Sequence, residues 1–483
     1  MQYGHRFAAI VVGTMTLSAC TLEPKYIRPD APVAITEQNV VSGIPAEKLG
    51  WRAFFPDPQL QQLIALALAN NRDLRVAALN VETAQARYRI QRAGLFPTIA
   101  ASTAEQAERQ PASVLAASLP AGSAPAQGSI VSRSYTAGIG FTNFELDLFG
   151  RIRSLDHADL QQYFSFEENR RSAQIALVAE VANAYLTVLT DQTLLEITRH
   201  TQRSQGDSYE LTLKMFERGT ATELALRQAE STVDTARANL AQYSRALAQD
   251  RDALQLLLGA PIPDGIDFSA GLERPNVVSE LEEAVSSDVL IKRPDVLAAE
   301  HLLEAANANI GAARAAFFPA IELTGSLGSA STELSGLFKH GSLAWTFAPQ
   351  ISVPLFAGGA NKANLMAAKV ARDTSVAQYE KAIQTAFREV ADALAARGHL
   401  DEQLAAQQAL VRASQKAYHL AQMRFRGGVD NYLSQLDAER SLYEAQQRLQ
   451  VVRLQRFENL VTLYKTLGGG LHENTASEVA VAG

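Results

Sequence analysis

The feature that most constrains this 483-residue chain is an internal duplication. Residues 73–97 align without gaps on residues 295–319 with nine identities, and residues 209–240 align on residues 418–449 with nine more. The offset falls from 222 to 209 between the two alignments, so the surplus in the first copy lies between them, where a loop is expected. A chain with such a period is expected to build its fold from two copies of one unit.

Each copy reads as a helix, a strand, a loop, a second strand and two long helices. Alanine-rich stretches from about 57 to 94 and from about 279 to 316 predict helices, and each stops just before a Phe-Pro pair, as a helix ahead of proline should. The sequence is therefore divided into the following parts: signal peptide 1–19, lipidated tether 20–55, repeat one 56–259, linker 260–278, repeat two 279–467 and flexible tail 468–483.

The strands of both copies alternate apolar and polar residues. In repeat two one face carries Trp345, Phe347, Ile351, Val353 and Leu355. The counterpart in repeat one keeps its phase to Phe141 and then slips to Phe144, which we interpret as a bulge or as the point where the strand leaves a membrane. The pattern is typical of membrane barrel strands, the alternative being a half-buried strand of a soluble sandwich. Stretches of about 109–133 and 330–342 are expected to be external loops.

Four proline-free stretches predict very long helices, at about 152–205, 208–258, 360–415 and 417–467. Each would extend roughly 75 to 80 Å at about 1.5 Å per residue. In the stretch 208–258 the core positions step by three and four, as in coiled coils, and all but Asp250 are apolar or aromatic: Leu226, Ala229, Val233, Ala236, Leu240, Tyr243, Leu247, Asp250, Leu254 and Leu257. The last helix carries a second apolar stripe, which favours a place in the wall of a helical cylinder.

Two positions compete for the turns between these helices. Simple hairpins would turn at about 205–208 and 415–417, whereas Gly219 and Gly428 offer turns further along. We favour the glycines, because glycine adopts positive φ at little cost. The preceding helix of each pair then becomes longer.

The N-terminus carries one short apolar run, from Phe7 to Leu17 after Arg6. It is too short to span a bilayer but fits a secretory signal. It ends in Leu17-Ser18-Ala19-Cys20, which resembles the bacterial lipobox, so Cys20, the only cysteine, is expected to be acylated. The residue after Cys20 is Thr21. Lipoproteins retained in the inner membrane carry Asp at this position, so its absence favours transfer to the outer membrane. Lipid is then one partner of the protein.

Composition excludes several classes of protein. A mean hydropathy of −0.06 is too low for a polytopic helical membrane protein. The formal charge of −7 becomes −8 once Arg6 leaves with the signal, so no nucleic-acid partner is expected. The eight histidines form no HExxH motif and no P-loop is present, so we predict no enzyme activity, no metal and no cofactor besides the covalent lipid.

Four strands per chain cannot close a membrane barrel, because single-chain barrels begin at about eight strands and an open sheet edge is not tolerated in lipid. Several chains must therefore share one barrel, and their long helices would share one cylinder on one side of the membrane. The predicted fold class is an α+β membrane protein.

The lipobox, the duplicated plan, the two Phe-Pro junctions and the segment from Phe425 to Leu433, followed by Leu436-Asp437-Ala438-Glu439-Arg440, resemble the TolC and OprM type of outer-membrane efflux protein. The resemblance covers the mature chain and favours the NodT-like lipoprotein branch. It implies a homotrimer with a twelve-stranded barrel and a helical periplasmic tunnel, lipid-anchored in the outer membrane. It also implies two partners, a periplasmic adaptor and an inner-membrane pump of the resistance-nodulation-division class, for which this chain is a passive exit duct.

The resemblance places the glycine turns at the periplasmic tip. Carboxylates that converge there on a symmetry axis would form a cation-selective ring, and the candidates are Asp430 and Asp437, whose counterparts Ala221 and Gln228 are uncharged. Each acid has a plainer interpretation as a solvated helix-end residue. Arg426 would hold the mouth shut by pairing with an acid of the neighbouring hairpin, either Glu217 or Glu223.

The candidate residues for adaptor contact are Gly219, Thr220, Gly428 and Val429, which serve equally well as ordinary turn residues. A periplasmic coiled-coil adaptor or scaffold is the rival function, but it leaves the amphipathic strands without a purpose. A lipid-anchored enzyme would need a polar constellation that the sequence does not display. Within the channel class, export of drugs, of metal ions and of secreted proteins is not separated by these residues.

Overall fold

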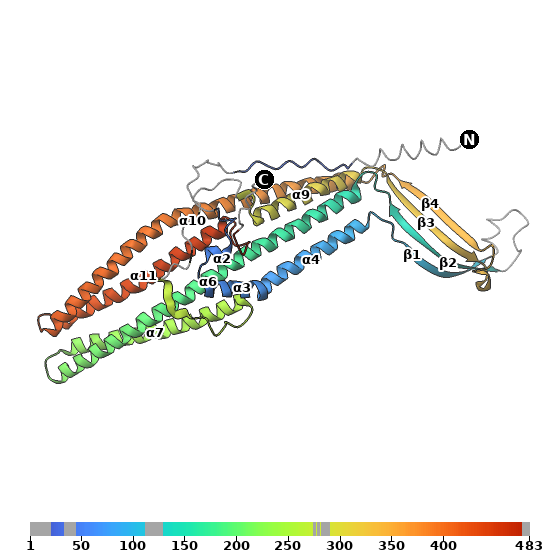
Figure 1. Ribbon diagram of the computed structural model, residues 1–483. Helices are drawn as coiled ribbons and strands as arrows, with labels where there is room; N and C mark the ends of the chain where they lie inside the picture. Colours follow the sequence, from blue (N-terminus) through green and yellow to red (C-terminus); the bar gives the residue numbers. More distant parts are fainter. Residues whose placement is uncertain are drawn as a thin grey trace, which may run out of the picture. The chain divides into compact units, whose positions relative to one another are not determined.

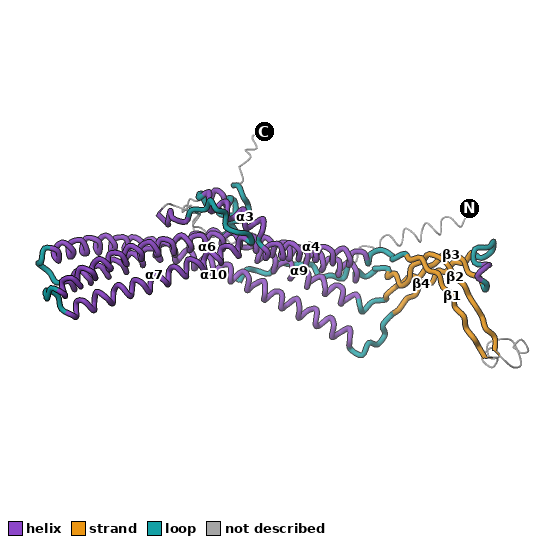
Figure 2. Tube along the Cα trace, turned by 90° about the horizontal axis from the view of Figure 1, so that it is seen from below, coloured by secondary structure: helices purple, strands orange, loops and turns teal. Residues whose placement is uncertain are grey.

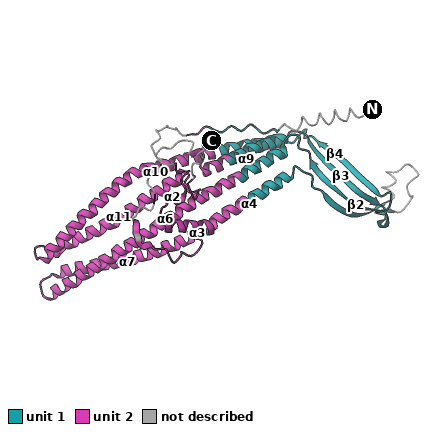
Figure 3. Ribbon diagram, viewed as in Figure 1, with its two compact units in different colours: residues 1–29, 83–163, 301–376 teal, residues 30–82, 164–300, 377–483 magenta. Residues whose placement is uncertain are grey.

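The structure, a computed structural model, describes residues 21–32, 45–111, 129–273, 277, 281 and 290–475. The predicted signal peptide and Cys20 lie outside these residues. The chain divides into two compact units (Figures 1 and 3), unit 1 with residues 1–29, 83–163 and 301–376, and unit 2 with residues 30–82, 164–300 and 377–483. Its helices and strands (Figure 2) are α2 Trp51–Phe54, α3 Pro58–Asn70, α4 Arg72–Ala93, β1 Ala100–Pro111, β2 Ser129–Glu145, α6 Arg151–Glu217, α7 Glu223–Leu258, the 3-10 helix η2 Phe268–Glu273, α9 Pro294–Ala315, β3 Ala320–Ser331, the 3-10 helix η3 Leu334–Gly336, β4 Leu343–Ser352, α10 Ala360–Arg426 and α11 Tyr432–Thr466.

Unit 1 contains one antiparallel sheet with the strand order β1-β2-β3-β4. The central β2–β3 pairing joins the two copies, with Gly138 opposite Gly328. The predicted apolar face is exposed on β4, where Trp345 is 72% exposed, Phe347 58% and Ile351 66%. Large apolar side chains on an exposed sheet face match the lipid-facing side of a barrel strand.

The slip predicted in repeat one is confirmed as an irregularity of β2. The pairing of β2 with β3 shifts register between Phe141 and Phe144, and Asn143 adopts a positive φ of 54°. The loop limits were too wide, because β1 extends to Pro111 and β2 already begins at Ser129. In repeat two β4 ends at Ser352, so Val353 and Leu355 lie beyond the strand.

Two helix limits predicted from composition are wrong. The predicted helix 57–94 is two helices, because Asn71 is extended and its side chain caps α4 by accepting a hydrogen bond from the backbone of Leu74 at 2.9 Å. The predicted helix 279–316 is interrupted, because residues 290 and 291 are helical, residues 292 and 293 are not, and α9 begins at Pro294. Proline disfavours helical backbone at the residue before it, which explains this start.

The long helices confirm the turns at the glycines. α6 and α10 contain 67 residues each and continue through 205–208 and 415–417, so the shorter limits at those places are wrong. At about 1.5 Å per residue each extends roughly 100 Å. α10 begins and ends 209 positions after α6, which is the offset of the sequence alignment. By length and composition α6 could cross a membrane, but 61% of its apolar window is buried within the protein.

The core of unit 2 includes residues from both ends of the described chain. The rings of Phe54 and Tyr464 stack at 3.8 Å, and the Tyr464 hydroxyl donates to the carbonyl of Leu49 at 2.6 Å. The backbone of Trp51 donates to the carbonyl of His472 at 2.9 Å. Residues 468–475 are therefore held against α2, and the prediction of a flexible tail is wrong for them, because backbone hydrogen bonds fix them.

The last helix is buried on two sides, as its two stripes predicted. Both stripes contribute buried residues, among them Leu436, Tyr443, Ala445, Leu449, Val452, Phe457, Val461 and Leu463. A helix with two buried faces must have neighbours on both, which fits a helical wall.

In unit 1, the residues that follow Cys20 lie against α6 and α9. Glu23 contacts His157 Nδ1 at 3.0 Å, and the carbonyl of Pro24 accepts a hydrogen bond from Asn307 at 2.7 Å. A Cβ at Gly311 would lie 2.9 Å from the Cα of Glu23, so this glycine permits the close approach. The start of the predicted tether thus lies against α6 and α9.

Candidate functional site

The turn between α6 and α7 is built around Gly219. This residue has a φ of +73°, and the backbone of Thr220 donates to the carbonyl of Met215 at 2.9 Å. Thr222 caps α7, its side chain accepting a hydrogen bond from the backbone of Ala225 at 3.2 Å. The positive φ explains why a glycine fixes the place of the turn.

The turn between α10 and α11 repeats this backbone. Gly428 has a φ of +71°, and the backbone of Val429 donates to the carbonyl of Arg424 at 2.9 Å. Asn431 stands where Thr222 does and accepts a hydrogen bond from the backbone of Ser434 at 3.1 Å. The two turns therefore have the same design.

The second turn alone carries an ion pair across its base. Arg424 Nε donates to Asp430 Oδ2 at 2.6 Å, and Arg424 Nη2 donates to Asp430 Oδ1 at 3.0 Å. These hydrogen bonds hold the pKa of Asp430 below its usual range. Asp430 is therefore ionised at neutral pH and bridges the end of α10 to the start of α11.

A small aromatic cluster packs the two hairpins against each other just behind the turns. Tyr432 and Leu436 of α11 lie against Ala229 of α7, with Phe425 and Tyr209 packed on them. The rings of Phe425 and Tyr432 are 5.6 Å apart, and burial raises the pKa of Tyr432 to about 12. Hairpin one, which is α6 with α7, is thus joined to hairpin two, which is α10 with α11, by apolar contacts near the turns.

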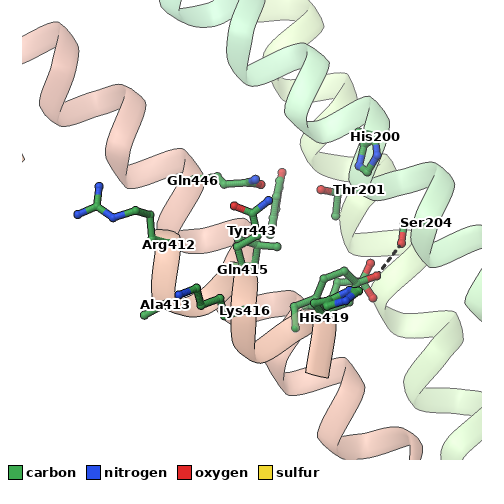
Figure 4. A pocket seen from close by; sticks show the side chains of 13 residues that line it. His200, Thr201, Ser204, Arg412, Ala413, Gln415, Lys416, His419, Tyr443 and Gln446 are labelled. Carbon is green, nitrogen blue, oxygen red and sulfur yellow. Dashed lines mark hydrogen bonds between the residues drawn. The ribbon is translucent and has the colours of Figure 1, made fainter. Parts of the chain in front are cut away.

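A cavity of about 870 Å³ lies further from the turns, between α6, α10 and α11 (Figure 4). Its wall includes His200, Arg412, Lys416 and His419 together with the buried Glu439. Burial raises the pKa of Glu439, and a hydrogen bond from Ser204 opposes that shift. The cavity wall combines several basic side chains with one buried carboxyl group.

The structure places the predicted tip residues on one end of each hairpin. Val429 is 66% exposed, and the exposed Thr220 uses its hydroxyl to bond the carbonyl of Met215 at 2.9 Å. Arg426 is the exposed last residue of α10, and Asp437 is exposed on α11. The structure thus joins Asp430 to Arg424, whereas the proposed pairing of Arg426 with a neighbouring acid stays a prediction.

Sequence reasoning missed Arg424 and the cavity. Arg424 is six positions before Asp430, and its counterpart in copy one is Met215, as Ala221 is that of Asp430. The joint replacement of an apolar pair by a charged pair was a signal that could have identified the contact. The cavity had no such signal, because residues from three helices form it.

Comparison with known proteins matches this chain to one family. The family model described as outer membrane efflux protein matches residues 63–260 and 285–469, which are the two copies.

Three similar proteins carry the likeness over nearly the whole chain. The antibiotic efflux pump outer membrane protein ArpC of Pseudomonas putida is 47% identical over 475 residues, covering 97% of this chain and 96% of that protein. The toluene efflux pump outer membrane protein TtgC, also of Pseudomonas putida, gives the same identity and coverage. The open state of the MtrE outer membrane channel of Neisseria gonorrhoeae aligns with a TM-score of 0.85 at 42% identity, covering 95% of this chain and all of that chain.

Proposed function

This chain belongs to the outer membrane efflux protein family, and from that premise we propose that three copies close one twelve-stranded barrel continued by a helical tunnel. The chain is the outer-membrane channel component of an efflux pump and extends into the periplasm. Such a channel passes cargo and performs no chemistry on it. The proposal concerns how the channel closes, what it meets and what it carries.

The open sheet is the observation that supports the trimer. β1 and β4 each pair on one side only among the described strands. An unpaired strand edge is not tolerated in lipid, so β4 of one subunit must pair with β1 of the next. Three chains with four strands each give a barrel of twelve strands, which lies within the range of membrane barrels.

Acylation of Cys20 would add a second anchor, and this covalent lipid is the one prosthetic group we propose. The residues just after it, held by His157 and Asn307, fix where the anchor leaves the protein. A lipid and a barrel together hold the protein more firmly than one acyl chain does.

The exposed turns fit contact with a periplasmic adaptor. Gly219, Thr220, Gly428 and Val429 form the ends of the two hairpins, and we propose that these ends are the periplasmic tip. An inner-membrane pump of the resistance-nodulation-division class would supply the energy.

We further propose that Asp430 and Asp437 form the cation-selective closed mouth, with Arg426 pairing to an acid of a neighbouring hairpin. Arg424 changes the expected strength of this ring, because each Asp430 already has a cation beside it. The ring at Asp430 is therefore expected to be weaker than one of unpaired carboxylates, and Asp437 carries more of the selectivity.

The cargo class we propose is small organic molecules, because the two similar proteins above are named for antibiotics and for toluene. Metal ions and secreted proteins are the alternatives. Growth of a deletion strain on antibiotics, toluene and copper salts separates organic molecules from metal ions, and the proteins in its culture medium test for secretion. Sensitivity to copper alone, or loss of a secreted protein with no sensitivity, would overturn the organic class.

The channel and its gate are tested in planar bilayers. The purified protein is expected to conduct with a preference for cations. Asp430→Ala should raise the conductance of the closed state about twofold and lower cation selectivity, because the mouth loses both a charge and a turn contact. Asp252→Ala, which changes an exposed acid of α7 away from the turns, is the matched control and should leave both unchanged.

A stable monomer in detergent without conductance would overturn the channel itself. Unchanged single-channel records for Asp430→Ala would remove only that residue from the gate.

A further inference from the structure

The two hairpins of one chain meet in a seam that includes Tyr443 of α11. The Tyr443 hydroxyl lies 2.9 Å from Thr198 Oγ1 of α6 and accepts a hydrogen bond from Asn239 of α7 at 3.3 Å. Close by, Gln447 donates to the Tyr243 hydroxyl at 2.9 Å. Tyr443 is only 9% exposed, so neutral hydrogen bonds and an aromatic ring hold this seam.

A closed ring of such chains must contain a second seam. Within the chain, hairpin two contacts hairpin one mainly through α11, and Tyr418 of α10 also lies 3.3 Å from Ser204 of α6. The opposite side of each hairpin, its outer face, is available for contact with a neighbouring subunit. Because α6 and α10 are related by one constant offset of 209, these outer faces align residue by residue with the faces of the first seam. In a head-to-tail ring, each outer face meets that of the neighbouring subunit.

The offset gives the residues of this second seam. Tyr443 corresponds to Asp234, Asn239 corresponds to Arg448, and Thr198 corresponds to Gln407. The hydroxyl that accepts is replaced by a carboxylate, and the amide that donates is replaced by a guanidinium group. The donor and acceptor roles are thus kept, with charge added.

A second pair of counterparts is chemically compatible as well. Gln447 and Tyr243, which form a hydrogen bond within the chain, correspond to Ala238 and Val452. Both polar residues become apolar together, so neither position brings a polar group that would need a hydrogen bond in the second seam.

The two charged side chains expected in the second seam are exposed in a single chain, whereas Val452 is already buried within it. That of Asp234 is 62% exposed and has Arg237 beside it at 3.1 Å, one turn away on the same helix. That of Arg448 is 69% exposed, with Glu444 at 3.8 Å. Such local pairs on a helix surface contribute little, which leaves both groups available to a neighbour.

We propose that Asp234 of each subunit forms an ion pair with the partner subunit's Arg448, flanked by Gln407 of that same partner. This inference rests on the proposed trimer and adds the chemistry of its subunit contact. The seam within a chain is then neutral and the seam between chains is ionic. Salt weakens the second seam and spares the first.

Photo-crosslinking distinguishes the two seams. A photo-reactive amino acid at position 448 of the full-length protein is expected to give covalent dimers, linked to the peptide around Asp234. The same probe at the matched position 239 should link within one chain, near Tyr443, and give no dimers. Links from position 448 to another helix, or within one chain only, would overturn the proposal.

Charge reversal tests the energetics. Asp234→Arg and Arg448→Asp should each lower the fraction of heat-resistant trimer about fivefold, and the double variant should restore most of it. Glu210→Arg and Arg203→Asp are the controls, because both residues and their counterparts His419 and Arg412 are exposed. A double variant no better than the single ones would also overturn the ion pair.

The wild-type protein keeps this test separate from that of the proposed function. A wild-type protein that is monomeric and does not conduct would overturn the channel. A conducting trimer whose position 448 links elsewhere would overturn only the ion pair.

Discussion

The turns of hairpin one and hairpin two share a backbone and differ in charge. Gly219 and Gly428 have φ values of +73° and +71°, and Thr222 and Asn431 cap the following helices in the same way. Where the second turn has Arg424 and Asp430, however, the first has Met215 and Ala221. Duplication has thus kept the residues that fix the path of the chain and changed those that set the charge at its tip.

The same division holds at the other end of the long helices. Asn71 donates to the carbonyl of Leu257 at 2.8 Å in copy one, and its counterpart Arg293 donates to the carbonyl of Thr466 at 3.2 Å. Arg293 also bonds Glu389 and Asp295, each at 2.7 Å. The side chain that bonds the last turn of the second long helix is therefore a neutral amide in copy one and an arginine in an ion network in copy two.

The largest expected effect tests these contacts of Asn71 and Arg293. Arg293→Ala should lower the free energy of unfolding by about 2 kcal/mol, since it removes the charged hydrogen bonds of a buried guanidinium group to Thr466, Asp295 and Glu389. Asn71→Ala should cost about 1 kcal/mol, the value of a cap and a hydrogen bond. Denaturant titration followed by far-UV circular dichroism measures both. Equal losses for the two variants would show that the added ions contribute nothing.

The contact between α6 and α7 in copy one contains two acids, whereas the equivalent contact between α10 and α11 in copy two is uncharged at these positions. Burial and a hydrogen bond to Asp250 raise the pKa of Asp191 to about 7, whereas the counterparts of these two acids are Leu400 and Asn459. A pKa raised in the folded protein means that the folded state binds more protons. Its stability therefore falls as the pH rises from about 4 to about 7.

Asp250→Asn, which copies Asn459, should remove this dependence on pH. We expect a gain of about 1 to 2 kcal/mol at pH 8, a modest figure because the site is only half-buried and water screens it. No gain is expected at pH 4. Thermal unfolding at both pH values measures the effect, with Asp252→Asn as the exposed control. A gain of equal size at pH 4 would assign the effect to packing and not to charge.

The smallest effect concerns what the copies share. Thr222→Ala and Asn431→Ala should each cost about 0.5 to 1 kcal/mol, since both side chains cap a helix in the same way. Hydrogen exchange should quicken in the first turn of α7 for one variant and of α11 for the other. If only one variant changed exchange, the two turns would not be equivalent.

Much of the fold could be predicted because periodicity is local. The glycine turns, the register slip after Phe141 and the two stripes of α11 all follow from spacing along the chain. The break at Asn71 and the start of α9 at Pro294 were missed because an alanine-rich composition hides a single capping residue or proline. The ordered residues 468–475 were missed because the hydrogen bonds that hold Leu471, His472 and Glu473 come from Gln174, Trp51 and Arg52, far earlier in the chain.

At the candidate site, the sequence predicted the turns but not the partners within them. Asp430 was identified as an acid at the tip, yet its ion pair with Arg424 depends on how the chain closes around Gly428. The basic cavity needed three helices to meet.

Glu230 and Glu439 show where the sequence ends and the tertiary structure begins. They are aligned, identical and on equivalent helices, although Arg227, three positions before Glu230, is replaced by Leu436 before Glu439. The side chain of Glu230 is 44% exposed and pairs with Arg227, whereas Glu439 is buried with its pKa raised. The sequence by itself determined the repeat, its turns and its long helices, because these depend on spacing along one chain. Only the packing of hairpin two on hairpin one decided which glutamate is buried from solvent, because burial depends on the residues that lie opposite.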